Sequence, residues 1–215
     1  EGAKTTDPKL LAQAIGVSQG EPSLGFSLDA VQQRVEQLGP VQRATVERIL
    51  PGTLRVSIVE RDAAAIWQTG GDGAPTKFLL IDKAGNVITD QSATAAKRRE
   101  PWLLLLVGAD APQHAAPLMD ALHGEPAVLS QVAAAERVDG LRWNLILKDQ
   151  TVVKLPVENA PAAIQELSRL QSSMRLLDRP VEMIDLRQPG RLVVRPYPTS
   201  ESVKVAQKKG AKSHE

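Results

Sequence analysis

The N-terminal part of the chain changes from a helical spacing of hydrophobic residues to an alternating one. Asp7-Pro8 predicts the start of a helix, because aspartate caps helices and proline suits the first turn, and Gly16 predicts its end. Ser27 caps a second predicted helix, which stops before Gly39-Pro40. Alternation on both sides of Pro51-Gly52 then predicts a β-hairpin. Two helices followed by two strands indicate a compact α+β unit.

After Arg61 the pattern becomes that of a region dominated by short strands. Apolar runs bounded by Gly, Asp and Asn indicate strands, and a polar, basic stretch indicates a surface loop. The expected elements are strands at 64–68 and 77–82 around a flexible glycine-rich loop at 69–73, a surface loop at 92–100, a buried strand at 102–107, and helices at 112–123 and 126–131.

The C-terminal part contains the clearest strand pattern of the chain and its longest predicted helix. Large apolar residues occupy every second position of one segment and recur at heptad-like spacing in another. The strand face consists of Leu141, Trp143, Leu145 and Leu147, and the helix stripe of Ala163, Leu167, Leu170, Met174 and Leu177. A further strand is expected at 151–155, and two last strands at 181–186 and 191–195. From Pro196 onward, prolines, serines and lysines predict a disordered tail.

Composition and charge exclude several classes of function. The 215 residues carry 26 Lys+Arg and 25 Asp+Glu, so a formal net charge of +1 provides no overall field for a nucleic-acid backbone. Cysteine is absent, which excludes disulfides, thiol nucleophiles and cysteine-type zinc sites. No apolar stretch approaches the roughly 20 residues of a membrane-spanning helix. The chain begins Glu1-Gly2-Ala3-Lys4 without an initiator methionine or a signal-like apolar region, which leaves open whether an anchor or signal has been removed.

No local motif indicates catalysis. The stretch 70–77 resembles a phosphate-binding loop, but Thr76 precedes Lys77 where that motif requires glycine. His114 and His123 are nine positions apart, which is not the spacing of a helical metal pair. We therefore expect no enzyme activity and no catalytic, cofactor-binding or metal-binding residue. A solvated tail is a better explanation of the C-terminal lysines than a contact with lipid or nucleic acid. These lysines are Lys204, Lys208, Lys209 and Lys212.

The final strand suggests a binding function. It comprises Arg191, Leu192, Val193, Val194 and Arg195, and lies between Pro189-Gly190 and Pro196. A terminal strand commonly forms a sheet edge, where unpaired backbone groups can accept a strand of another chain. An ordinary edge protected by its two arginines explains the same residues equally well.

Four segments in collinear order resemble the FtsQ/DivIB family of cell-division proteins. The segment 38–61, LGPVQRATVERILPGTLRVSIVER, is similar to the family's POTRA signature, although the usual proline after Glu-Arg is missing. AAAIW at 63–67 completes this first motif, and the other three are LLIDKAGNV at 79–87, LRWNLIL at 141–147 with VKLP at 153–156, and IDLR at 184–187 before the last strand.

The resemblance implies an α+β fold with an N-terminal POTRA domain followed by a mostly antiparallel β domain with flanking helices. On this basis we expect the POTRA domain at 1–61, the β domain at 62–198 and a disordered tail at 199–215. In this family a transmembrane helix precedes a periplasmic POTRA domain, whose first strand would end near Thr6. The anchor and most of that strand would therefore lie outside this sequence.

The resemblance also implies partners and contact residues. It indicates a periplasmic, non-enzymatic division scaffold at the septum that binds FtsB and FtsL and links early division proteins to the septal peptidoglycan synthase FtsW–FtsI. A strand of FtsB would pair with the last strand, and the longest helix would flank the site. The residues expected to contact FtsB are Arg142, Arg187, Arg191, Leu192, Val193, Val194, Arg195 and Pro196. The alternative is a POTRA chaperone-like module of an outer-membrane assembly or secretion system.

Overall fold

The computed structural model describes residues 1–18, 25–71 and 73–197. They form an α+β protein, as predicted, and the chain divides into two compact units, Glu1–Ala116 and Pro117–Glu215. The domain boundary expected at Arg61 stays a prediction. The expected tail at 199–215 lies outside the described residues.

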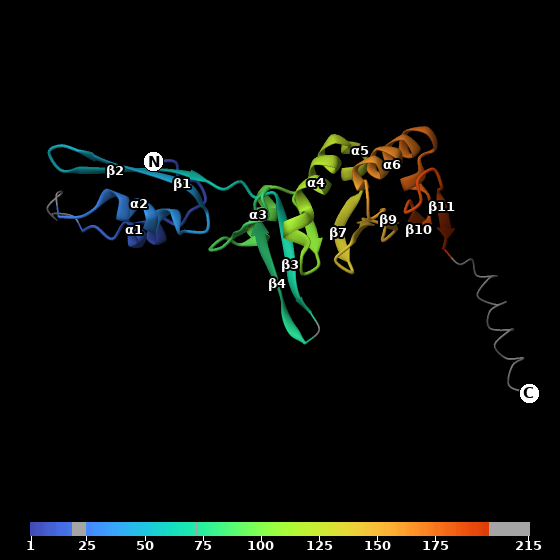
Figure 1. Ribbon diagram of the computed structural model, residues 1–215, viewed down its shortest axis with the longest axis horizontal. Coiled ribbons are helices and arrows are strands. Elements are labelled where there is room, and N and C mark those ends of the chain that lie inside the picture. The colour runs from blue at the N-terminus through green and yellow to red at the C-terminus, as the bar shows by residue number, and fades with distance from the viewer. Residues whose placement is uncertain (19–24, 72, 198–215) are drawn as a thin grey trace, which may run out of the picture. The chain divides into compact units, whose positions relative to one another are not determined.

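The first unit begins with the predicted pair of helices and a hairpin (Figure 1). These elements are α1 (Pro8–Ile15), α2 (Leu28–Glu36), β1 (Val41–Ile49) and β2 (Thr53–Glu60). The predicted caps are confirmed, since the side chains of Asp7 and Ser27 accept backbone hydrogen bonds and Gly16 ends α1 at φ 62°. The helices cover one face of the hairpin, and the core between them consists of Val31, Val35, Val41, Ala44 and Ile58.

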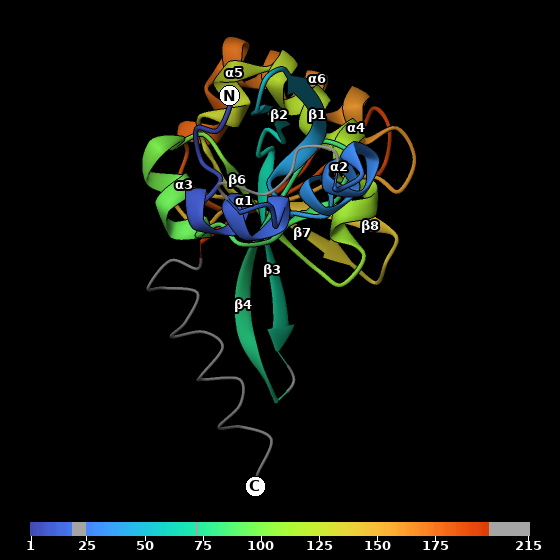
Figure 2. The same ribbon diagram turned by 90° about the vertical axis from the view of Figure 1, so that its left-hand side faces the viewer.

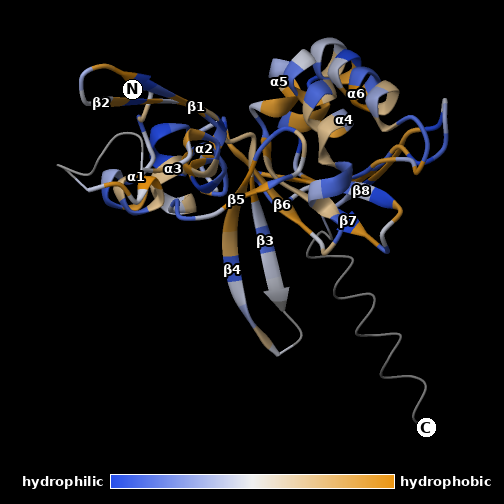
Figure 3. Cartoon of the chain, turned by 60° about the vertical axis from the view of Figure 1, so that its left-hand side comes forward, coloured by the Kyte–Doolittle hydropathy of each residue, from blue (hydrophilic) through white to orange (hydrophobic). Residues whose placement is uncertain are grey.

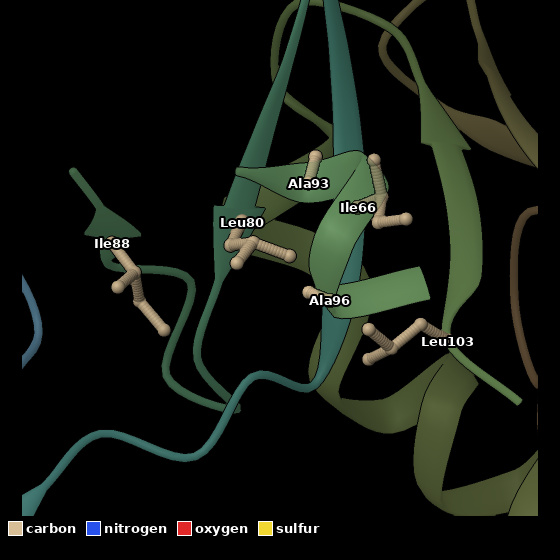
Figure 4. Packing of buried hydrophobic residues seen from close by; sticks show 6 residues of the cluster. All are labelled: Ile66, Leu80, Ile88, Ala93, Ala96 and Leu103. Carbon is tan, nitrogen blue, oxygen red and sulfur yellow. The ribbon is translucent and has the colours of Figure 1, made fainter. Parts of the chain in front are cut away.

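Four short strands and one helix complete the first unit. They are β3 (Ala65–Gly71), β4 (Ala74–Ile81), β5 (Val87–Ile88), α3 (Ala93–Arg99) and β6 (Leu104–Val107). The strand order is β6-β3-β4-β5, in which β3 and β6 are parallel and the other pairs antiparallel. Figure 4 shows their core, made of Ile66, Leu80, Ile88, Ala93, Ala96 and Leu103.

Three sequence predictions for this region are wrong. The segment 92–100 is not a loop, because Ser92 caps α3 and the small residues Ala93 and Ala96 let this helix pack closely on the core. The strand predicted from Trp102 begins only at Leu104, and Trp102 is 49% exposed. The glycine-rich segment 69–73 is mostly strand, because β3 continues to Gly71 and pairs with β4.

The β3–β4 hairpin extends beyond the strands that flank it (Figures 1 and 2). β4 pairs with β5 only through Leu80 and Ile81, so the outer edge of its first residues has no neighbouring strand within the described residues. Accordingly, β4 is buried at its end and exposed from Ala74 to Phe78. Figure 3 shows strongly hydrophobic residues of β4 next to the core and mostly pale ones, with one hydrophilic band, farther out.

The second unit contains five strands and the helices that cover them. Its elements are the end of α4 (Ala111–Gly124), α5 (Pro126–Leu129), β7 (Val132–Val138), β8 (Arg142–Leu147), β9 (Val152–Lys154), α6 (Ala160–Met174), the short 3-10 helix η1 (Leu176–Asp178), β10 (Val181–Asp185) and β11 (Val193–Pro196). The order is β11-β10-β9-β8-β7, and only β9 and β10 are parallel. α5 and α6 lie on one side of these strands (Figures 1 and 2).

The core of the second unit confirms the predicted strand face only in part. Trp143, Leu145 and Leu147 are buried, but Leu141 precedes β8 and is 57% exposed. On α6, Ile164 and Leu167 are completely buried, whereas Met174 of the predicted stripe is 42% exposed. β7 was not predicted, because its alanine-rich sequence has low intrinsic strand preference and is held by pairing with β8.

No helix within the described residues has the length and hydrophobicity needed to cross a membrane.

Candidate functional site

The last strand, β11, lies at the edge of the second unit's strand order. It pairs with β10 on one side, in the register Met183 to Arg195, Ile184 to Val194 and Asp185 to Val193. No strand of the described residues pairs with its other side. β11 begins at Val193 rather than at the predicted Arg191, and it includes Pro196 as its last residue. Its outward N–H and C=O groups are therefore available for another strand, up to the proline.

The edge carries large apolar side chains that the fold leaves exposed. Leu192 is 37% exposed, Val193 40%, Val194 36% and Tyr197 43%. Four large apolar residues within six consecutive positions are unusual for a solvated edge strand, which is normally protected by charge. Only Arg191 and Arg195 provide such charges here.

Strand register places three predicted contact residues at one end of these strands. Asn144 on β8, Lys154 on β9 and Asp185 on β10 lie in one row of partners, with Val193 of β11 opposite Asp185. From this row, the strand directions carry Arg142, Arg187 and Arg191 toward the same end, each two residues farther along. The sequence predicted these arginines separately, and the fold brings them to the same end of the strands.

Arg187 is held in place by Asp185. Its Nε donates to both carboxylate oxygens, at 2.9 and 3.0 Å, and its Nη2 donates to Oδ2 at 2.7 Å. These hydrogen bonds lower the pKa of Asp185, although its burial acts in the opposite direction, and they raise the pKa of Arg187. Both groups therefore stay charged, and the guanidinium has one fixed orientation.

Arg142 is engaged differently. Its Nη1 lies 3.2 Å from Oδ2 of Asp139, and its side chain is 26% exposed. Its Nε is buried and has no hydrogen-bond partner. The same is true of Oδ1 of the neighbouring Asn144. Buried polar atoms without partners are uncommon, so this part of β8 has capacity for further hydrogen bonds.

Two hollows border the segment that leads into β11. One, of about 550 Å³, lies between α6 and the segment 186–192, where Leu170, Leu186 and Leu192 contribute apolar walls. The other, of about 400 Å³, is lined by Asp185, Arg187, Gln188, Arg191 and Val193. α6 thus flanks this segment, as the resemblance implied. The second hollow has two cationic side chains and one carboxylate, which favours an acidic ligand group.

Other candidates from the sequence show no arrangement of this kind. His114 and His123 both lie on α4, and Nε2 of His114 is 3.5 Å from Asp110. Across the described residues, no three His, Asp or Glu side chains are grouped as metal ligands. The phosphate-loop-like stretch 70–77 belongs to the β3–β4 hairpin, with Asp72 outside the described residues.

The sequence did not predict the role of one half-buried carboxylate in the first unit. Glu60, at the end of β2, accepts hydrogen bonds from the backbone N–H groups of Lys4, Thr5 and Thr6 and from both threonine hydroxyls. Burial would raise the pKa of Glu60, but these hydrogen bonds outweigh it and lower the pKa to about 2. The conspicuous Thr5-Thr6 pair was the available signal.

Comparison with known proteins gives the family. The family described as "Cell division protein FtsQ/DivIB, C-terminal" matches residues 65–187, and "POTRA domain, FtsQ-type" matches residues 1–61. The chain belongs to the FtsQ/DivIB family. It is therefore a member of a family of cell-division proteins, and the resemblance found in the sequence is confirmed.

Several relatives carry the name "Cell division protein FtsQ". The protein of Caulobacter vibrioides is 36% identical over 195 residues, which cover 91% of this chain and 62% of that protein. The protein of Rhizobium radiobacter is 35% identical over 182 residues, covering 85% of this chain and 82% of that protein. The protein of Rhizobium meliloti is 33% identical over 202 residues, which cover 94% of this chain and 62% of that protein. The chain thus spans about three fifths of the Caulobacter and R. meliloti proteins.

Proposed function

We propose that this chain is the periplasmic part of a single-pass inner-membrane division scaffold, which acts at the septum by binding FtsB and FtsL. It would link early division proteins to septal peptidoglycan synthesis through FtsW–FtsI. The function is that of an assembly surface, without catalysis. Membership of the FtsQ/DivIB family supports the role in division.

The observation that carries the proposal is the exposed apolar edge at β11. A strand of FtsB would add to this edge through backbone hydrogen bonds, with Leu192, Val193 and Val194 exposed beside it. Pro196 at the end of β11 would stop the added strand there, because proline has no N–H to donate. Backbone pairing supplies affinity in this mode, and side chains supply specificity.

The arginines would supply that specificity. Arg187 is oriented by Asp185, so an acidic side chain of FtsB would meet a guanidinium that needs little further ordering. Arg142 is partly exposed at the same end of these strands, and Arg191 lines the same hollow as Arg187. Arg195 on β11 would flank the added strand.

We propose further that a membrane anchor precedes Glu1, with the POTRA domain at 1–61 and the β domain at 62–198. The N-terminal amino group of Glu1 donates to Val56 O at 2.6 Å, and Ile58 N–H donates to Glu1 O at 2.9 Å. This is the hydrogen-bond pattern of a parallel strand beside β2. It supports a first POTRA strand that would continue upstream of Glu1.

The proposal is tested by measuring binding of an FtsB periplasmic peptide to charge and proline variants. Arg187→Glu should lower the affinity at least about tenfold, since a charge-assisted contact becomes a repulsion. Arg179→Glu is the matched control: it makes the same charge change just before β10, whereas Arg187 lies just after that strand. Equal affinities for these two variants, with native circular dichroism, would remove the proposed site.

Two proline variants test strand addition itself. N–H groups of successive residues point to opposite sides of a strand, so one of Val193→Pro and Val194→Pro removes an outward N–H and the other an inward one. The variant with unchanged hydrogen exchange at β10 identifies the outward position, and it should not bind FtsB. Normal binding by that variant would rule out strand addition at β11.

A further inference from the structure

The end of α3 and the turn after it form a surface that the division function above does not use. It consists of Lys97, Arg98 and Arg99 in the last turn of α3 and Trp102 in the following turn, and we call it the basic patch. Lys97, Arg98 and Arg99 are exposed, and Trp102 is 49% exposed. Glu100 is the acidic residue within this stretch, and it is half-buried.

The packing of α3 fixes the direction of the basic patch. Ala93 and Ala96 face Leu80 and Ile66 in the core, as Figure 4 shows. At about 100° per residue, Arg98 then points almost directly away from that core, and Lys97 and Arg99 lie on the two flanks. The orientation of these cations follows from a helix that cannot rotate without exposing its alanines.

Lys97 holds the turn that presents Trp102. Its ammonium donates to the carbonyl of Pro101 at 2.7 Å and to the carbonyl of Leu103. The turn is tightened by backbone hydrogen bonds from Glu100 to Ala96 and from Leu103 to Glu100. Trp102 therefore lies beside the last turn of α3, between two residues whose carbonyls are fixed.

Arg98 and Arg99 differ from Lys97, whose ammonium is held by hydrogen bonds. Within the described part of the chain, the side chains of Arg98 and Arg99 make no hydrogen bond, ion pair or ring contact. Cations at a helix C-terminus are favourable for the helix dipole, and this accounts for a basic last turn. It does not account for an indole that is 49% exposed in the turn directly after these two arginines.

We propose that the basic patch binds the surface of an anionic phospholipid bilayer. Arginine side chains reach phosphate groups of lipid headgroups, and tryptophan partitions into the headgroup region because its ring is apolar and its N–H polar. The end of a short helix is a convex surface, and a bilayer can contact such a surface without a matching cavity in the protein. The two hollows described above lie in the second unit and therefore do not provide a peptide-binding groove at the basic patch.

The number of charges argues against nucleic acid as the ligand. Two unengaged arginines and a net charge of +1 for the chain would neutralise few phosphates, and affinity for nucleic acid scales with that number. Weak contacts with a bilayer become significant when a protein is already held near it, because the effective concentration is high. The inference does not depend on FtsB binding, and its test uses no protein partner.

The experiment measures co-sedimentation of the 215-residue chain with vesicles of equal parts phosphatidylglycerol and phosphatidylcholine, at about 0.1 M salt. Replacing Arg98 and Arg99 by glutamine should lower the partition coefficient roughly 25-fold, or about fivefold for each charge. Lys208→Gln with Lys209→Gln is the matched control, because it removes two charges from the basic tail instead. Arg98→Lys with Arg99→Lys should retain binding, and Trp102→Ala should weaken it several-fold.

Three outcomes would overturn the proposal. The first is a loss in the tail control as large as that in the arginine variant, which would assign binding to the tail. The second is equal sedimentation with vesicles of phosphatidylcholine alone, which would exclude recognition of anionic headgroups. The third is no sedimentation of the unchanged chain with anionic vesicles. Loss of binding only in the arginine variant and Trp102→Ala supports it.

Discussion

Glu60 joins the start of the chain to the end of β2 through a single carboxylate. Three backbone N–H groups and two hydroxyls donate to it, and Thr5 Oγ1 also accepts from Gln91 Nε2 at 2.7 Å. The adjacent Arg61 donates to Asp82 at 2.9 Å. Two consecutive residues therefore anchor β2 to segments that are distant in the sequence.

Glu60→Gln should destabilise the N-terminal α+β part by about 1–2 kcal/mol at pH 7, after allowance for solvent screening. The pKa of Glu60 is lowered from 4.5 to about 2, so its stabilising contribution is fully present above pH 4.5 and is lost as the pH falls through 2. The difference between the variant and the unchanged chain should therefore shrink between pH 4.5 and pH 2.

Hydrogen exchange of β1 and β2, measured at neutral pH and at both ends of this acidic range, is the appropriate assay. Glu47→Gln serves as the control, because Glu47 is an exposed β1 residue whose partner Arg55 lies 3.8 Å away. A Glu60→Gln effect that is as small as that of the control at neutral pH would show that the carboxylate contributes little.

At the scale of single elements, α6 separates residues that look equivalent in the sequence. Leu167 is completely buried, and Met174 is 42% exposed beside the end of the helix. Leu167→Ala should lower the free energy of unfolding of the second unit by about 2–5 kcal/mol, because it leaves a cavity. Met174→Ala should change it by less than about 0.5 kcal/mol. Urea titrations followed by tryptophan fluorescence, with Trp67 and Trp102 replaced by Phe so that Trp143 alone reports, would compare them, and similar losses would contradict the observed packing.

The helices show which structural features a sequence pattern predicts and which it does not. Asp7, Ser27 and Gly16 act through local hydrogen bonds and backbone angles, so their roles could be predicted from type and position. The choice between Ile164 and Met174 depends on which side of α6 meets the strands, and a short amphipathic pattern does not specify this. β7 and the outer half of the β3–β4 hairpin exist because of pairing with another strand, and their composition gives little sign of it.

The residues of the candidate site were proposed from the sequence on two grounds, and their contact with FtsB stays a prediction. Family motifs pointed to Arg142 and Arg187, and the terminal position of the strand 191–195 pointed to a sheet edge. Their common location at one end of β8 to β11 follows from register, which requires the fold. The hydrogen bonds that orient Arg187 also require it, since Asp185 is two residues away and would be an ordinary exposed neighbour in another conformation.

At the scale of the whole molecule, pairing differs between its parts. β1 and β2 form a two-stranded sheet, and the outer edge of β2 is bonded to the backbone of Glu1. β8, β9 and β10 each have a neighbour on both sides. Because amide protons in doubly paired strands need a larger opening to exchange, protection should be lower in β2 than in β9.

Removing residues 1–4 should widen that difference, because it deletes the Glu1 hydrogen bonds and one N–H that reaches Glu60. Exchange at β2 should become roughly tenfold faster, since about 1.4 kcal/mol of local stability corresponds to that factor. Exchange at β9 and α6 should stay the same. A chain without its last four residues is the matched control and should leave both regions unchanged. Equal protection of β2 and β9 in the unchanged chain would refute the prediction, as would a loss in β9 that follows the N-terminal deletion.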